Sequence, residues 1–194
     1  MRFRAAAATA ALMLACAGGA FAAGASLTPM GQSMNPMVGG QAMMMSKDIV
    51  DNAVNSPDHT TLVAAVKAAG LVDTLKGKGP YTVFAPTNEA FAALPDGTIP
   101  TLLKPENKGT LTKVLTYHVV PGRLDSAALA ELIEHGHGMA QLKTVEGGTL
   151  IAMMNGPKNI VLKDEKGDVA SISTYDVYQS NGVIQVIDKV VMPR

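Results

Sequence analysis

Apolar residues in the first half of the folded part of the chain recur at helical spacing and predict short amphipathic helices. One such helix should begin after Ser56-Pro57, an N-cap followed by proline at the first helical position, and end at Gly70. Its apolar face would consist of Leu62, Val63, Val66 and Ala69. The same spacing predicts helices over 49–54, 99–103, 111–115 and 129–133.

Residues 81–94 combine a strand, a stop and a new helix. The segment from Tyr81 to Phe84 is aromatic and β-branched, which favours a strand. Pro86 lacks an N–H and ends that strand, and Thr87 or Asn88 can cap the helix that follows. We expect the bulky side chains of the stretch to enter one core: Tyr81, Phe84, Phe91 and Leu94.

The second half of the chain shows strand patterns separated by turns. Asn155-Gly156 is a strong hairpin signal between two of these strands. An earlier strand is expected over 117–120, where Pro121-Gly122 ends it. The later strands are expected over 142–145, 149–154, 160–163, 169–173 and 183–192. Helices grouped before strands predict an α+β fold rather than alternating α/β.

Composition and motifs argue against several classes of function. Lys+Arg and Asp+Glu both total 16, so no net charge favours nucleic acid or an anionic membrane. The chain has no Trp and only four Phe and four Tyr, which leaves few rings for stacking on sugars or bases. The sequence has no Gly-x-Ser-x-Gly elbow, His-Glu-x-x-His pair or dinucleotide-binding glycine pattern. We expect no nucleic-acid partner, no cofactor and no enzymatic activity.

Residues 1–22 have the features of a secretory signal peptide in the expected order. Two arginines precede an apolar run over 5–17 that is too short to span a bilayer as a helix, and 20–22 fits a cleavage site. We therefore expect an exported protein, periplasmic or extracellular. A lipid anchor at Cys16, the only cysteine, is the less favoured alternative, because the residues before Cys16 fit a lipoprotein signal poorly.

Residues 23–46 are expected to be a flexible linker rich in Met, Gly and Pro, followed by a folded domain over 47–194. Thioethers are soft ligands that can hold Cu(I). No His or Cys joins the methionines, so a flexible tether is the favoured interpretation. The methionines of the linker are Met30, Met34, Met37, Met43, Met44 and Met45.

Three blocks of this chain, 82–91, 117–119 and 181–188, together resemble the fasciclin domain family in their order and spacing. The resemblance covers about 47–192 and is specific because three blocks occur in order. The residues that carry it are Phe84, Pro86, Thr87, Asn88, Phe91, Tyr117, His118, Asn181, Gly182 and Asp188.

The resemblance implies a wedge of two small β-sheets with helices packed on one side. It also implies a non-enzymatic protein that acts in adhesion through protein or polysaccharide contacts. The chain is most similar to bacterial secreted single-domain members, which places it at the cell envelope, in the extracellular matrix or in a biofilm. Gln185 stands where many relatives carry His, which weakens any metal or acid–base role for that strand.

Tyr117 and His118 are the candidate partner-binding residues that the resemblance suggests. As neighbours in a strand they would point to opposite faces, so only one could face the core. We favour a structural role, in which the ring nitrogens of His118 bond to nearby backbone or hydroxyl groups and hold its strand against residues 81–94. The other motif residues are also expected to be structural.

The remaining histidines predict no metal site. His135 and His137 lie on a glycine-rich segment without further ligands, and we expect an exposed loop there. His59 is expected to be neutral and near the surface, because it lies in the first turn of a predicted helix.

Three functional hypotheses remain open at this point. The favoured one is an exported adhesion or surface-association module. The alternatives are a periplasmic small-molecule or copper-binding protein that uses the Met-rich linker, and a hydrolase whose Ser, His and Asp meet only in the fold. An exposed apolar patch without a cavity would favour the first, and a closed pocket with convergent polar groups the others.

Overall fold

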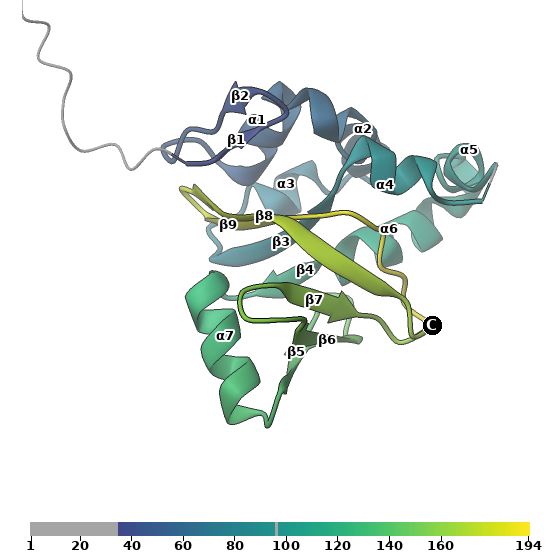
Figure 1. Cartoon of the computed structure of the whole chain (residues 1–194). Helices are drawn as coiled ribbons and strands as arrows, with labels where there is room; N and C mark the ends of the chain where they lie inside the picture. Colours follow the sequence, from purple (N-terminus) through teal and green to yellow (C-terminus); the bar gives the residue numbers. More distant parts are fainter. Residues whose placement is uncertain (1–34, 96) are drawn as a thin grey trace, which may run out of the picture. The chain divides into compact units, whose positions relative to one another are not determined.

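The computed structural model describes residues 35–95 and 97–194 (Figure 1). The predicted signal peptide over 1–22 and Cys16 lie outside these residues. The helices and strands are, in order, β1 (Met37–Val38), β2 (Gln41–Ala42), α1 (Ile49–Asn55), the 3-10 helix η1 (Pro57–His59), α2 (Thr60–Ala69), α3 (Val72–Leu75), β3 (Tyr81–Pro86), α4 (Asn88–Ala92), α5 (Thr98–Leu102), the 3-10 helix η2 (Pro105–Asn107), α6 (Lys108–Tyr117), β4 (Val119–Pro121), α7 (Ser126–His135), β5 (Met139–Lys143), β6 (Thr149–Met154), β7 (Ile160–Lys163), β8 (Val169–Gln179) and β9 (Gly182–Ile187).

The larger sheet of the described residues has seven strands in the order β4-β3-β9-β8-β7-β6-β5. All neighbouring strands are antiparallel except β3 and β9, which run parallel. The long strand β8 pairs with β7 near its start and with β9 toward its end, and its register with β9 shifts at irregularities around Thr174. The two small sheets expected from the family are thus joined through one irregular strand, and the predicted α+β class is confirmed.

The stretch 81–94 folds as predicted into a strand and a helix. β3 lies in the sheet between β4 and β9, and Thr82 and Phe84 are fully buried within it. β3 ends at Pro86, and α4 begins at Asn88 after an N-cap in which the Thr87 hydroxyl accepts from the Ala90 N–H at 3.2 Å. Thr87 rather than Asn88 is therefore the cap.

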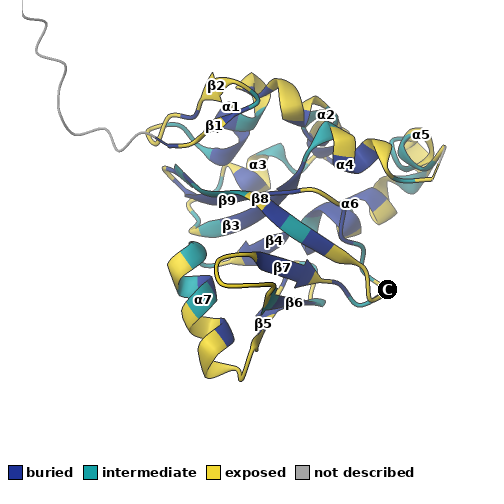
Figure 2. Ribbon diagram, in the orientation of Figure 1, coloured by how far each residue is buried: buried dark blue, intermediate teal, exposed yellow. Residues whose placement is uncertain are grey.

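The side chains of this stretch enter two cores rather than the single core expected. Val83 and Ala85 belong to a cluster with α1, α2 and α6, and Phe91 joins them from α4. Phe84 belongs to a second cluster, formed with α7 and strands β5 to β8. The prediction of one core was wrong because successive side chains of a strand point to opposite faces of the sheet. Figure 2 shows the buried sheet strands between exposed helix surfaces.

The segment just before α1 packs against the domain, although it was expected to belong to a flexible linker. β1 and β2 form a short hairpin, and Val38 and Met43 from this segment are buried in the first core. Asn35 accepts a 2.9 Å hydrogen bond from the Tyr178 N–H, and Asn52 donates to the Met44 carbonyl at 2.7 Å. From residue 35 onward, the linker expectation is therefore wrong. Two-residue strands have no periodicity that a sequence could reveal.

Candidate functional site

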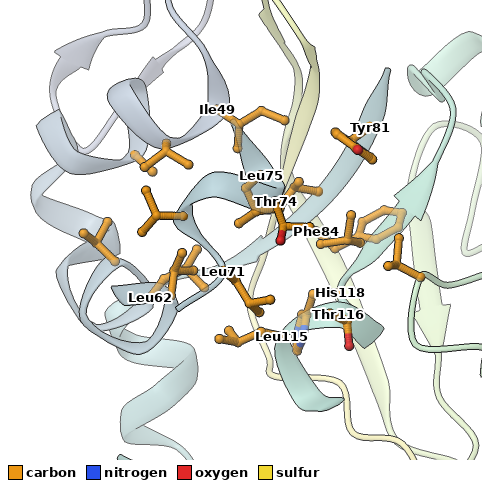
Figure 3. A pocket seen from close by; sticks show the side chains of 18 of the residues that line it. Ile49, Leu62, Leu71, Thr74, Leu75, Tyr81, Phe84, Leu115, Thr116 and His118 are labelled. Carbon is orange, nitrogen blue, oxygen red and sulfur yellow. The ribbon is translucent and has the colours of Figure 1, made fainter. Parts of the chain in front are cut away.

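His118 lies at the end of α6, before β4, and not inside a strand. The strand expected over 117–120 begins only at Val119, because Tyr117 is the last residue of α6 and His118 is its C-cap. A short aromatic and β-branched run does not by itself distinguish a strand from a buried helix end. Figure 3 shows the His118 ring beside Leu115 and Thr116 of α6.

Both ring nitrogens of His118 have backbone partners. Nδ1 lies 2.7 Å from the Val114 carbonyl oxygen, and Nε2 lies 3.2 Å from the Val191 backbone nitrogen. These partners fit a neutral ring that donates from Nδ1 and accepts at Nε2. Burial lowers the pKa of His118 to about 4, so the ring is uncharged at neutral pH. The His118 carbonyl also accepts from the Phe84 N–H at 2.9 Å, which ties the end of α6 to β3.

Tyr117 is buried together with His118, because a helix end can turn both side chains inward where a strand could not. Its hydroxyl donates to the Thr149 carbonyl at 2.8 Å and accepts from the Glu165 N–H at 3.3 Å. Burial raises the pKa of Tyr117 to about 12. Neither candidate partner-binding residue lies on the surface: His118 is 2% exposed and Tyr117 is fully buried.

Asn88 and Asn181 connect chain segments that are distant in sequence. The Asn88 side chain accepts from the Thr61 N–H at 3.0 Å and donates to the Pro57 carbonyl at 2.8 Å, which joins α4 to the start of α2. The Asn181 side chain accepts from the Ile49 N–H at 3.1 Å and donates to the Leu75 carbonyl at 2.7 Å. Each amide thus satisfies backbone groups at helix ends.

The block over 181–188 is also bound into the fold. A Cβ on Gly182 would lie 2.0 Å from the Tyr81 carbonyl oxygen, so only glycine fits beside β3. Asp188 accepts from the Ser171 N–H at 2.7 Å. Gln185 is fully buried and its amide bonds to the Asp176 N–H, the Asp176 carboxylate and the Leu124 carbonyl. Gln185 therefore joins β9 to β8 and to the chain entering α7.

The histidines outside this block differ in exposure. His135 and His137 are exposed, and Nδ1 of His135 faces the Glu131 carbonyl of its own helix. His59 is buried at 3% exposure, so the expectation of a surface position was wrong, and burial lowers its pKa. Its Nε2 has no hydrogen-bond partner in the described residues. Within those residues, no group of three or more His, Cys, Asp or Glu side chains could hold a metal ion.

The methionines of the predicted linker are divided by the fold. Met30 and Met34 lie outside the described residues. Met43 is buried in the first core, whereas Met37 and Met44 are 64% and 53% exposed. The Met43 thioether is occupied by packing, so the described segment offers fewer exposed thioethers than the sequence suggested.

A pocket that the sequence did not predict lies beside His118, among α1, α2, α3, β3 and the end of α6 (Figure 3). Its volume is about 90 Å³. Ile49, Leu62, Val66, Leu75 and Leu115 are among its lining residues. The lining is largely apolar. Both His118 nitrogens have backbone partners, the Thr116 hydroxyl donates to the Thr112 carbonyl at 2.8 Å, and the other polar lining residues are Lys67, Thr74 and Tyr81. The arrangement can hold an apolar group.

Comparison with known proteins agrees with this fold. The Fasciclin domain model matches residues 57–193. The chain belongs to the fasciclin domain family. Protein sll1483 from Synechocystis is 46% identical over 147 residues, which cover 75% of this chain and 73% of that protein. The fasciclin match thus includes all three sequence blocks, 82–91, 117–119 and 181–188.

Two further matches are a cell surface protein and a protein of known structure. Cell surface glycolipoprotein MPB83 from Mycobacterium bovis is 35% identical over 167 residues, covering 83% of this chain and 68% of that protein. A solved FAS1 domain pair from the insect cell adhesion molecule Fasciclin I matches with a TM-score of 0.67 at 15% identity, covering 74% of this chain and 50% of that one. The structural match shows the same fold.

Among residues 35–95 and 97–194, no helix has the length and apolar character needed to cross a membrane.

Proposed function

We propose that this fasciclin-domain protein is an exported surface-association module that binds a protein or polysaccharide of the cell surface or matrix and performs no catalysis. The match to the fasciclin domain over 57–193 supports this proposal most directly. The insect relative of known structure is described as a cell adhesion molecule, and MPB83 as a cell surface glycolipoprotein. We extend this kind of role to the present chain.

The contacts of such a module would lie on exposed loops and helix faces rather than on the family motifs. Phe84, Tyr117 and His118 are buried, and Asn181 bonds to backbone groups of its own domain. A rigid scaffold with variable exposed loops is the usual arrangement for recognition. We therefore propose that the motif residues hold the scaffold and that a partner contacts other residues.

The test is a pull-down with the processed protein, tagged at its C-terminus and expressed in its own host. The tagged protein is incubated with separate envelope and matrix fractions, with and without prior removal of polysaccharide. We expect saturable retention of the fasciclin protein on one fraction. Retention equal to that of an unrelated tagged protein of similar charge, on every fraction, would overturn the proposal.

A further inference from the structure

Some residues that line the pocket beside His118 are exposed to solvent. Its lining includes Val145, which is 43% exposed, and Lys67, which is also exposed. Val63 and Val72 line it as well and are half-buried. Apolar side chains thus continue from the interior of the pocket to the surface.

The interior of the pocket is lined mainly by apolar side chains, which suits a hydrocarbon group. The polar atoms of His118 and Thr116 already have backbone partners, so a polar ligand group beside them would lose its hydrogen bonds to water and gain none. The other uncharged polar groups of the lining are the Thr74 and Tyr81 hydroxyls. The volume of about 90 Å³ is smaller than the ~150 Å³ of a dry cavity known to take up benzene. Only the end of a chain fits inside, and the rest of such a ligand must follow the apolar rim outward.

Lys67 gives the rim its charge. It is the one charged residue among the described residues that line the pocket. The ion pairs present in the described part of the chain join Lys76 to Asp48 and Asp51, and none involves Lys67. An exposed ammonium at the edge of an apolar pocket complements a ligand with an anionic head and an apolar tail.

We propose that this pocket binds a free fatty acid, with the end of the alkyl chain in the cavity and the carboxylate beside the Lys67 ammonium. The apolar interior selects the chain end, and Lys67 favours a carboxylate over a neutral or cationic head. This proposal is argued from the pocket and Lys67 alone, so it does not depend on whether a macromolecular partner is found.

The test is calorimetric titration of the processed protein with decanoate below its micelle concentration. Decanol and decyltrimethylammonium have the same chain with a neutral or cationic head, and acetate has the same head without the chain. We expect saturable binding of decanoate, weaker binding of decanol and no binding of acetate or the cation.

Two variants separate the contributions of tail and head. Ala53→Leu adds side-chain volume at a residue that lines the pocket, and leucine suits the helix α1. Ala53→Leu should lower the affinity for both decanoate and decanol by about tenfold or more. Lys67→Gln should weaken decanoate by about fivefold and leave decanol unchanged. Lys113→Gln, an exposed lysine of α6 outside the pocket lining, is the matched control and should change neither.

Several outcomes would overturn the fatty-acid site. The first is decanoate binding that Ala53→Leu leaves intact, and the second is equal affinity for decanoate and decyltrimethylammonium. The third is binding to phosphatidylglycerol vesicles, titrated in the same way, without binding of free decanoate. If Ala53→Leu unfolds the protein, Val63→Phe at the half-buried rim replaces it, and unchanged decanoate affinity in that variant has the same meaning.

Discussion

The protonation state of His118 couples the stability of the domain to pH. Nε2 accepts the Val191 N–H, so a proton added there would remove this bond and place a charge in an apolar core. The pKa of His118 falls from 6.5 to about 4 in the folded protein. Because the unfolded chain takes up this proton more readily, acid favours unfolding. The pKa of His59, which is also lowered by burial, acts in the same direction.

We predict that the His118 contribution to the free energy of unfolding is constant above pH 6.5 and decreases as the pH falls from 6.5 to about 4. The total decrease from this residue should be about 3 kcal/mol. Urea unfolding across this range measures it, and His118→Gln, which cannot titrate, should show a shallower dependence. An NMR titration of the folded protein that places the His118 midpoint near 6.5 would contradict the prediction.

Phe84 tests the importance of the second core. Its side chain is fully buried and packs with residues of α7 and of strands β5 to β8. Phe84→Ala should lower the free energy of unfolding by about 3–5 kcal/mol, because a large cavity remains. Phe84→Leu keeps most of the volume and should cost distinctly less. Chemical denaturation of both variants makes the comparison, and equal costs would show that cavity formation is not the cause.

At the scale of elements, the segment over 35–45 acts as a clasp on the first core. Its contacts join residues far apart in the sequence, such as Asn35 and Tyr178. Its composition of Met, Gly and Pro is typical of a linker, and its attachment depends on Val38 and Met43 meeting a core that forms elsewhere. The sequence contains no local signal for such a contact, which explains why the linker expectation failed here.

Neighbouring methionines provide a test of the clasp. Met43 is 6% exposed and Met44 is 53% exposed. We predict that Met43→Ala lowers the free energy of unfolding by about 2 kcal/mol, and Met44→Ala by less than about 0.5 kcal/mol. Thermal and urea unfolding measure both. Equal small effects would mean that the hairpin contributes little to stability.

The sequence predicted most of the elements because their signals are local. The strand at Tyr81, the stop at Pro86 and the Asn155-Gly156 turn each depend on neighbouring residues. The end of α6 was missed because Tyr117 and His118 have strand-like neighbours, and only the packing of the helix end decides their conformation. The pocket was missed for a different reason: its walls come from several elements, so no spacing along the chain reveals it.

At the scale of the whole molecule, the three fasciclin blocks identified the fold more surely than they identified a function. A fold hosts many functions, and sites are added to it. Here the side chains of block residues bond mainly to backbone groups elsewhere in the domain, such as those of Ile49 and Thr61, so their presence reports the scaffold. We place the residues that would select a partner on the exposed surface outside the blocks, so the blocks do not identify them.

We predict that His118→Ala destabilises the molecule more than it weakens adhesion by the fraction that stays folded. Removal of the side chain leaves the Val191 N–H and the Val114 carbonyl without partners in the core, which costs stability. Melting curves and retention on the envelope or matrix fraction, corrected for folded protein, make the comparison. An unchanged melting temperature with lost retention would instead support a direct partner contact.

Export can be tested on the intact gene product. We predict cleavage near Ala23, since residues 1–22 have the order of a signal peptide. N-terminal sequencing of the exported protein measures it directly. Incorporation of labelled palmitate that disappears in Cys16→Ser would contradict this prediction and indicate a lipid anchor.

Strand β8, which pairs with both β7 and β9, has a consequence for how this protein unfolds under mechanical force. Its first residues pair with β7 above one core and its last residues pair with β9 above the other. Loss of either core frees part of β8 and exposes the hydrogen bonds of its remaining part. If a bound partner pulls on the protein, we therefore expect the two cores to unfold together as one cooperative unit rather than one after the other.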